Sequence, residues 1–190
     1  MTHNTTLARI SPLGPEDVDP ATASLLRSRE RKWGKSWNIA RTLANAPAVL
    51  AMMDSVWDCL DQSTLSAADR ELIDMEMAVS NGCHYCVPAH RYVARREAKL
   101  DATERHILET VSRGEEPPEG TRLAAMQRLV RLMIARRGGL TDDEFSEFQS
   151  LGFTPQQMIE TIAEIAHCTM TNYANRLAKT PLDSFLEPYR

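Results

Sequence analysis

The stretch from Ser66 to His90 decides the fold, and its sequence is SAADRELIDMEMAVSNGCHYCVPAH. It opens with a serine followed three positions later by an aspartate, which is the spacing of a capping box that begins a helix. The next helix-breaking pair is the Asn-Gly before the first cysteine, so the pattern predicts a helix over about 67–80. Helical spacing then resumes and predicts a second helix from near Cys83 to about Lys99.

Two thiols, an imidazole and a carboxylate lie in this stretch at a spacing that suits dithiol chemistry. Cys83 and Cys86 are three positions apart, and His90 follows four positions after Cys86, so these side chains project from one side of the second helix. Glu71 lies on the preceding helix and must reach them across the turn. A helix amino terminus and a nearby imidazolium both stabilise a thiolate, whose parent thiol has a pKa of about 8.5. We therefore predict a redox enzyme.

These four residues are the candidate catalytic groups. His90 can take the proton of Cys86 directly or through one water, and Glu71 can orient the imidazole and stabilise its charged form. Cys83 is then placed to condense with a sulfenic acid on Cys86 and release water.

Other uses of the same residues stay open. A zinc site normally needs four ligands, and the remaining thiols, Cys59 and Cys168, do not form a second CxxC, although the CxxC, its histidine and Glu71 would make a set of four. The paired cysteines could also be ordinary core residues, because unpaired cysteine is among the most buried types. A purely structural disulfide is less favoured, since so short a loop removes little chain entropy.

The spacing of Glu71, Cys83, Cys86 and His90 resembles the core motif of the AhpD-like alkylhydroperoxidases, within the carboxymuconolactone decarboxylase superfamily. The resemblance implies an all-α fold, peroxidase activity on hydroperoxides through the CxxC dithiol, and a homo-oligomer, trimeric or larger. It also implies that Cys86 is the peroxidatic thiol, that Cys83 resolves it, and that Glu71 and His90 form a proton relay.

The resemblance extends over most of the chain, because residues 38–47 and 172–178 are similar to flanking segments of the same family. One departure is visible. Some relatives have histidine directly before the second cysteine, where this chain has Tyr85, with His84 one position earlier. The role of a second imidazole in the relay therefore stays open.

The resemblance further implies that a lipoyl- or thioredoxin-like dithiol carrier protein reduces the CxxC again. The sequence has no Gly-rich phosphate-binding loop, so we expect no bound cofactor, and NADH or flavin would be held by a partner reductase.

Composition is compatible with this interpretation. The chain has 190 residues, 43% of them hydrophobic and 25% charged, which suits one globular domain. Its net charge of −4 gives no indication of nucleic-acid binding. The segment Met1–Thr6 lacks the apolar region of a secretory leader, and no apolar run approaches the length of a membrane span. A reactive cysteine pair favours a reducing, cytoplasmic location.

We expect a single all-α domain over residues 1–190, with N-terminal helices (1–62), a CxxC-containing half (63–113) and a degenerate second half (119–180). A shift of 85 residues aligns the CxxC segment with the segment that begins at Cys168, which suggests a duplicated helical unit. Apolar periodicity and caps predict further helices over 20–33, 47–61, 102–112, 119–137, 142–150 and 155–178.

The sequence also predicts locations for four other side chains. Cys59 is expected in the core, His167 is expected to be a packed or capping residue, and Trp33 and Trp37 are assigned either to a substrate entrance or to a subunit interface. The alternative functions are a decarboxylase-like enzyme, in which Glu71 and His90 act on a small acid, and a non-catalytic zinc-binding or redox-sensing protein.

Overall fold

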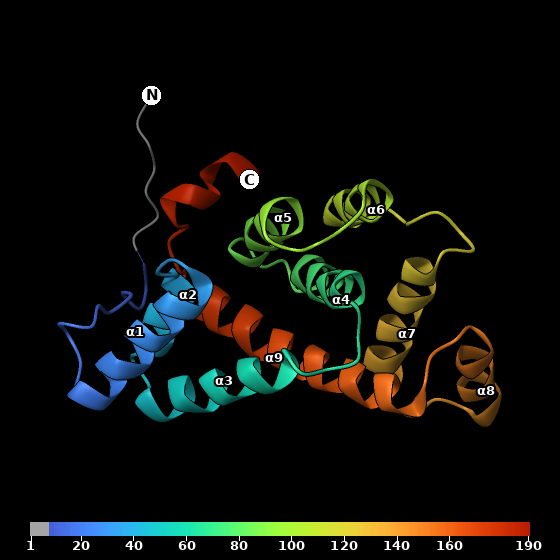
Figure 1. Cartoon of the computed structure of the whole chain (residues 1–190), viewed down its shortest axis with the longest axis horizontal. Helices are drawn as coiled ribbons and strands as arrows, with labels where there is room; N and C mark the ends of the chain where they lie inside the picture. The colour runs from blue at the N-terminus through green and yellow to red at the C-terminus, as the bar shows by residue number, and fades with distance from the viewer. Residues whose placement is uncertain (1–7) are drawn as a thin grey trace.

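A computed structural model describes residues 8–190, and these residues form nine α-helices, one 3-10 helix and no strand (Figure 1). The predicted all-α class is confirmed. The segment Met1–Thr6 lies outside the described residues. In chain order the elements are α1 (Pro20–Trp33), α2 (Asn38–Leu43), α3 (Pro47–Leu60), α4 (Ala67–Ser80), α5 (Cys86–Arg96), α6 (Ala102–Ser112), α7 (Arg122–Arg136), α8 (Asp142–Ser150), α9 (Pro155–Ala178) and η1 (Ser184–Tyr189).

Local capping explains why most helices begin where the sequence predicts. The side chain of Ser66 accepts a hydrogen bond from the backbone N–H of Asp69, and the Asp69 side chain accepts one from the backbone N–H of Ser66. Equivalent capping boxes begin α6, α8 and α9. Helix α7 begins three residues later than predicted, because Thr121 caps it by accepting from the N–H of Ala124.

Helix α4 is the central element of the fold. It packs against α5, α6, α7 and α9, and α9 also contacts α2, α3 and α7 (Figure 1). Leu72, Ile73 and Met75 of α4 are at most 1% exposed and belong to a core shared with α6, α7 and α9. Burial of such side chains on folding contributes roughly 1.5–3 kcal/mol each.

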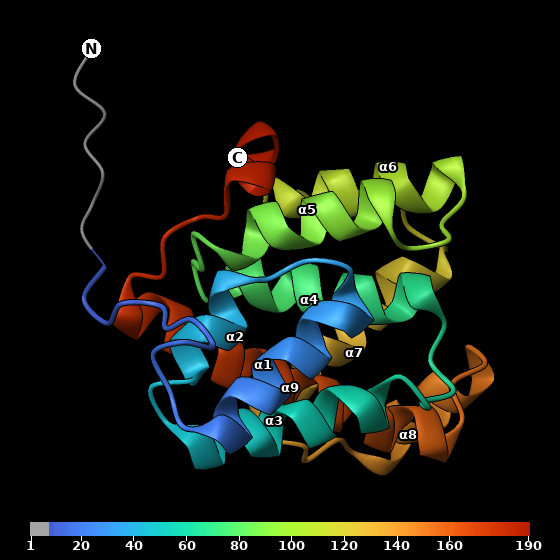
Figure 2. The same cartoon turned by 60° about the vertical axis from the view of Figure 1, so that its left-hand side comes forward.

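A second core lies at the other end of the molecule, where α1 and α3 run side by side and α3 contacts α9 (Figure 2). Residues of α1, α2 and α3 pack there against Cys83, Tyr85 and Cys86 at the start of α5. The CxxC segment therefore belongs to this second core, whereas the α4 helix that precedes it is anchored in the first. Among residues 8–190, no helix is long and apolar enough to cross a membrane.

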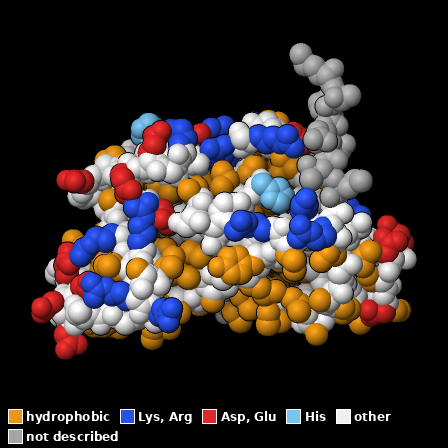
Figure 3. All heavy atoms as spheres, turned by 180° about the vertical axis from the view of Figure 1, so that it is seen from behind, with side chains coloured by type: hydrophobic (Ala, Val, Ile, Leu, Met, Phe, Trp, Pro, Cys, Tyr) orange, Lys and Arg blue, Asp and Glu red, His pale blue; other side chains and the backbone are white. Residues whose placement is uncertain are grey.

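One face of α9 leaves large apolar side chains exposed. Ile159, Ile162, Tyr173 and Leu177 are 47% to 69% exposed and are spaced along the whole length of the helix. Seen from behind, hydrophobic side chains gather over the lower half of the molecule, the half in which Figure 1 places α9 (Figure 3).

Candidate active site

The two cysteines of the CxxC segment are joined in a disulfide, with their Cα atoms 5.2 Å apart. The chain reaches this position through Gly82, whose φ of +58° is a left-handed conformation that glycine adopts without strain. Helix α5 begins at Cys86, three residues after the predicted start near Cys83, and ends at Arg96 instead of about Lys99, so Cys83 lies just before the helix. Both residues are buried, with 1% exposure for Cys83 and 3% for Cys86.

His90 and Glu71 are brought together across the turn between α4 and α5. The Nδ1 atom of His90 lies 3.2 Å from Oε2 of Glu71, so this predicted juxtaposition is present in the structure. A second carboxylate, that of Asp74, was not predicted at the site; its Oδ2 lies 3.6 Å from the same nitrogen. Asp74 follows Glu71 by three positions on α4, and this i, i+3 pairing of acids was the available signal.

The charges around His90 change its protonation. Burial alone would lower the pKa of His90, but Asp74 and the hydrogen bond with Glu71 outweigh it and raise that pKa to about 9. Burial raises the pKa of Asp74 to about 6, and the nearby charge of Glu164 acts in the same direction. His90 is therefore an imidazolium at neutral pH, held between two carboxylates. Because Nδ1 faces these carboxylates, Nε2 is the nitrogen available for proton transfer.

Asp74 connects this site to a second polar cluster on α9. The thiol of Cys168 donates to Oδ1 of Asp74 at 2.7 Å, and burial together with that carboxylate raises the pKa of Cys168 well above its usual range. Cys168 is therefore a neutral donor at physiological pH. Glu164 is fully buried, pairs with Arg70 at 3.1 Å, and has its Oε1 3.4 Å from Nδ1 of His167.

The tautomer of His167 bears on whether this cluster suits a metal. The Asp74, Glu164, His167 and Cys168 ligand atoms lie within 4.8 Å of one another. Trp57 Nε1 donates to Nε2 of His167 at 2.7 Å, so the neutral ring keeps its proton on Nδ1, the nitrogen that faces Glu164. A ligating nitrogen must be unprotonated, so the arrangement suits hydrogen bonding better than metal binding.

Two asparagines of α9 contact the Cys86 sulfur. Asn172 Nδ2 lies 3.3 Å and Asn175 Nδ2 lies 3.4 Å from Cys86 Sγ. Their segment is similar to a family segment in sequence, but no role was predicted for either asparagine. Asparagine is a poor helix former, and a pair of asparagines three positions apart inside a long helix was a signal that could have identified them.

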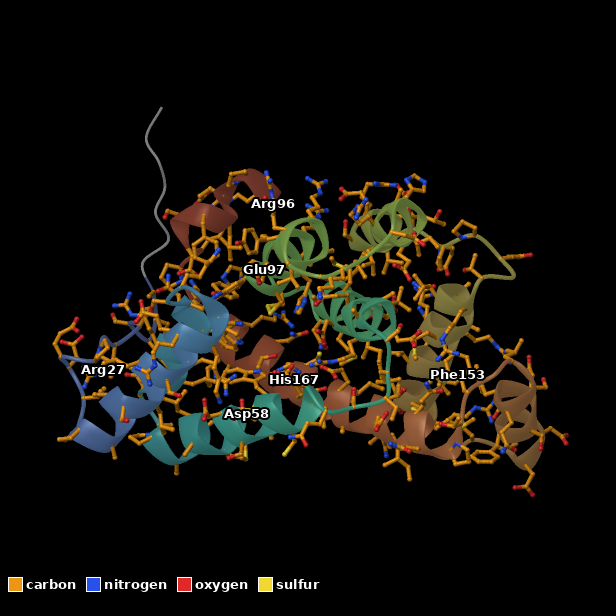
Figure 4. The ribbon with its side chains drawn as sticks, in the orientation of Figure 1. Arg27, Asp58, Arg96, Glu97, Phe153 and His167 are labelled. Carbon is orange, nitrogen blue, oxygen red and sulfur yellow. A yellow bond between two sulfur atoms is a disulfide. The ribbon has the colours of Figure 1, made fainter. Side chains whose placement is uncertain are left out.

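A cavity of about 390 Å³ joins these groups. Its lining includes Cys86 and His90 from α5, Glu71 and Asp74 from α4, and side chains of α1, α2, α3 and α9, whereas Cys83 does not line it. Figure 4 shows Glu97, another lining residue, just after α5 and His167 on α9.

Three tryptophans form the aromatic part of the cavity lining: Trp33, Trp37 and Trp57. Trp33 and Trp37, which were predicted to line either a substrate entrance or a subunit interface, lie at the cavity beside Cys86. The rings of Trp33 and Trp57 meet edge to face with centroids 4.7 Å apart. Arg29, which lies 5.1 Å from both ring centroids and binds Asp54, helps to fix their positions.

The structure corrects the prediction for Cys59 and extends the one for His167. Cys59 is exposed and not part of the core, because the buried positions of α3 are Leu50, Met53, Trp57 and Leu60, a 3–4 spacing that excludes it. His167 is packed against Trp57, as expected, but it also lines the cavity, which the prediction did not include.

The residues between the two cysteines bind the C-terminal segment and not the His90 cluster. Tyr85 donates its hydroxyl hydrogen to Asp183, and His84 Nε2 lies 3.0 Å from the carbonyl oxygen of Thr180. A second imidazole is therefore not placed in the relay in this structure, and these two side chains hold the segment after α9 against the CxxC turn.

Comparison with known proteins agrees with this architecture. Residues 46–131 match the model of the carboxymuconolactone decarboxylase family. No curated protein sequence matches the chain. A peroxidase-related protein from Ralstonia eutropha JMP134, described as an alkylhydroperoxidase AhpD core, has a TM-score of 0.79 at 19% identity, covering 97% of this chain and 96% of that one.

Two further solved structures have the same fold. A peroxidase-related protein from Silicibacter sp. TM1040 has a TM-score of 0.78 at 19% identity, with 100% of both chains covered. The debrominase Bmp8, in complex with 2,3,4-tribromopyrrole, has a TM-score of 0.72 at 17% identity, covering 98% of this chain and 97% of that one. The chain therefore has an AhpD-like fold, and its residues 46–131 are similar to the carboxymuconolactone decarboxylase family.

Proposed function

We propose that this protein is a thiol peroxidase that reduces hydroperoxides at Cys86, with Cys83 as the resolving thiol. The observation that supports it most directly is the arrangement of Cys86, which is bonded to Cys83 and lines the same cavity as the His90 imidazolium. A thiolate needs a nearby positive charge, and the leaving alkoxide needs a proton donor. His90 meets both needs.

The proposed reaction has two steps. The Cys86 thiolate attacks the terminal oxygen of ROOH, the O–O bond breaks, and the departing RO⁻ takes a proton from Nε2 of His90, which leaves a sulfenic acid and ROH. The Cys83 thiol then attacks the sulfenic sulfur, the disulfide forms and water leaves. Glu71 and Asp74 act by keeping His90 protonated before the first step.

A dithiol carrier must return two electrons to the disulfide. Both sulfurs are buried, and only Cys86 lines the cavity, so the attacking thiol has to enter that cavity. We expect a slender, flexible dithiol such as a lipoyl arm to be a better reductant than a thioredoxin-like protein, whose thiols lie on a folded surface.

The decarboxylase-like alternative is less favoured by the charges of the cavity. Its lining includes five carboxylates, of Asp61, Glu71, Asp74, Glu97 and Glu164, but only Arg70 and the His90 imidazolium as cations. The net negative charge of the lining would therefore repel the anion of a small acid.

Reductive dehalogenation is a second candidate, and the tryptophan-lined part of the cavity favours it. A flat halogenated ring would stack on these indoles beside Cys86. The Cys86 thiolate would attack the bromine atom of an aryl bromide, the C–Br bond would break, and the ring carbon would take a proton, which gives a sulfenyl bromide. The Cys83 thiol then attacks the sulfenyl sulfur, the disulfide forms, and bromide and a proton leave. The protein product is again the disulfide, so the two functions differ in the substrate and share the thiol chemistry.

One experiment tests both functions. Fully reduced protein is mixed with one equivalent of cumene hydroperoxide or tribromopyrrole, and thiol state, cumyl alcohol and bromide are measured by mass spectrometry and ion chromatography. The peroxidase proposal predicts the Cys83–Cys86 disulfide and one equivalent of alcohol, and it requires that Cys86→Ser yield neither. Bromide release without peroxide consumption would replace it with dehalogenation. Reduction of neither substrate would reject both functions.

A further inference from the structure

We infer that Asn172 and Asn175 of α9 form an anion-stabilising donor pair for the Cys86 sulfur, and that the Asn175 side-chain oxygen accepts the hydrogen of the hydroperoxide. The first part concerns the thiolate alone. The second part rests on the proposed peroxidase function.

The donor geometry is specific to one sulfur. The two Nδ2 atoms approach Cys86 Sγ at 3.3 and 3.4 Å from successive positions of the same helix face, and both asparagines are only 1% exposed. The Oδ1 of Asn172 accepts a hydrogen bond from Nδ2 of Asn81 at 3.1 Å, and in this arrangement the N–H group of Asn172 faces the sulfur.

The strength of the Cys86 sulfur as a hydrogen-bond acceptor indicates the redox state in which the two asparagine amides are best bonded. Burying an amide is unfavourable unless its donors are well bonded, and a neutral sulfur is a weak acceptor. A thiolate is a charged acceptor, and hydrogen bonds to charged groups are roughly twice as strong as neutral ones. In the disulfide form the two amides face the weak acceptor, so their placement is best explained by the reduced, anionic form of Cys86.

The oxygen of Asn175 supplies the second observation. It is a buried acceptor that has no hydrogen-bond partner within the part of the chain that the structure describes, and Asn175 lines the cavity. A hydroperoxide has one O–H donor, on the oxygen that a thiolate attacks. An acceptor on the same amide that contacts Sγ would hold that oxygen beside the sulfur. The hydrogen stays on this oxygen as it transfers to sulfur, so Asn175 positions the substrate and does not act as a base.

Both asparagines lie outside residues 46–131, the region that matches the family model. The cysteines and the His90 cluster come from inside that region. Helix α9 thus completes the site from a separate part of the chain, and its contribution can be tested without altering the motif.

The test uses Asn172→Leu and Asn175→Leu, which remove the amides at similar volume, and the isosteric Asn172→Asp and Asn175→Asp in case a leucine variant does not fold. Thr161→Val is the matched control, since it removes a fully buried polar group from α9 that bonds only within its own turn and to Met126. All variants are made in a Cys83→Ser background, and iodoacetamide labelling of the Cys86 peptide is followed by mass spectrometry across pH. Circular dichroism checks folding.

Loss of either donor should raise the pKa of the Cys86 thiol by about one unit, so that the thiolate fraction at neutral pH falls roughly tenfold. Either aspartate should raise this pKa further, because a carboxylate repels the thiolate. Labelling curves of the asparagine variants that superimpose on those of the parent and Thr161→Val would overturn the donor pair.

Steady-state kinetics with cumene hydroperoxide and the Cys83-containing variants test the second part. Asn172→Leu should lower kcat/KM only as far as the thiolate fraction falls, whereas Asn175→Leu should lower it several-fold further, with a higher KM. Equal effects of the two changes would overturn the substrate contact and leave the donor pair in place. If the parent protein reduces no hydroperoxide while the labelling curves still shift, the proposed function and the substrate contact fail, but the donor pair stands.

Discussion

Asp74 Oδ2 lies 3.6 Å from Nδ1 of His90, the same nitrogen that binds Glu71, and Asp74 Oδ1 accepts the Cys168 thiol hydrogen. One carboxylate thus links the CxxC site to α9. Because two carboxylates face one imidazole, His90 stays charged although it is largely buried. The positive charge kept on His90 is the group that we expect to stabilise the Cys86 thiolate.

Serine substitutions should separate the roles of the two cysteines. We expect Cys86→Ser to lose nearly all peroxide turnover, because it removes the attacking thiolate, and Cys83→Ser to react once and stop at the sulfenic acid. Trapping with a sulfenic-acid reagent, followed by peptide mapping, measures both. Label on Cys83 in the wild-type protein would reverse the assignment, and a disulfide to exposed Cys59 as the main product would remove the resolving role of Cys83.

Two groups of the site, His90 and Asp74, should each contribute less stability to the disulfide form as pH rises. The folded-state pKa of His90, about 9, is above its ordinary 6.5, so its contribution is fully present below pH 6.5 and is lost as pH rises through 9. Asp74 is raised from 3.8 to about 6, and the stability that comes from its protonated form is lost between those values. Thermal unfolding from pH 4 to pH 10 measures this dependence.

A His90→Asn variant is the comparison for that measurement. Its melting temperature should fall less between pH 6.5 and pH 9 than that of the wild type, since the group responsible for the upper part of the loss is absent. An equal fall in both proteins over that interval would show that other groups cause it.

Helix boundaries were predictable because they depend on local signals. The capping boxes beginning at Ser66, Asp101, Thr141 and Thr154 each satisfy backbone N–H groups within four residues, so sequence spacing alone identifies them. Helix α2 and η1 have six residues each and no side-chain cap, and apolar periodicity is too short in them to be recognised.

Only the site residues that belong to the CxxC motif and its family spacing could be predicted from the sequence. Glu71 was found because its spacing to the CxxC resembles a family pattern. Asp74 lies one turn after Glu71 on α4, so its spacing was a usable signal. Asn172 and Asn175 contact Cys86 from segments 86 and 89 residues away, and sequence spacing does not show which residue they will meet. Cys59 was misplaced for a related reason, since its burial depends on the face of α3 that meets α1 and α9. The proposed duplication of the two halves stays a prediction.

The exposed stripe of α9 predicts self-association. Ile159, Ile162, Tyr173 and Leu177 place more apolar surface on one helix face than isolated exposed residues would, which is typical of an interface between subunits. We expect light scattering at micromolar concentration to show a trimer or larger closed oligomer. Ile162→Glu should dissociate it, and the exposed Gln149→Lys on α8 should not. A wild-type monomer would contradict the prediction.

The sharpest prediction concerns the carboxylates of His90. Glu71→Gln and Asp74→Asn each remove one charge at nearly constant shape, so the imidazolium becomes less favourable and the pKa of the Cys86 thiol should rise. Iodoacetamide labelling of Cys86 at neutral pH should slow, and peroxide turnover should fall by roughly a hundredfold or more if proton transfer through His90 is lost. His90→Phe should have the same effect or a larger one. Glu97→Gln is the control, because Glu97 lines the same cavity but pairs with Lys35. If the labelling curves of all four variants match the wild type, the helix terminus and the α9 amides alone stabilise the thiolate, and the proton relay is wrong.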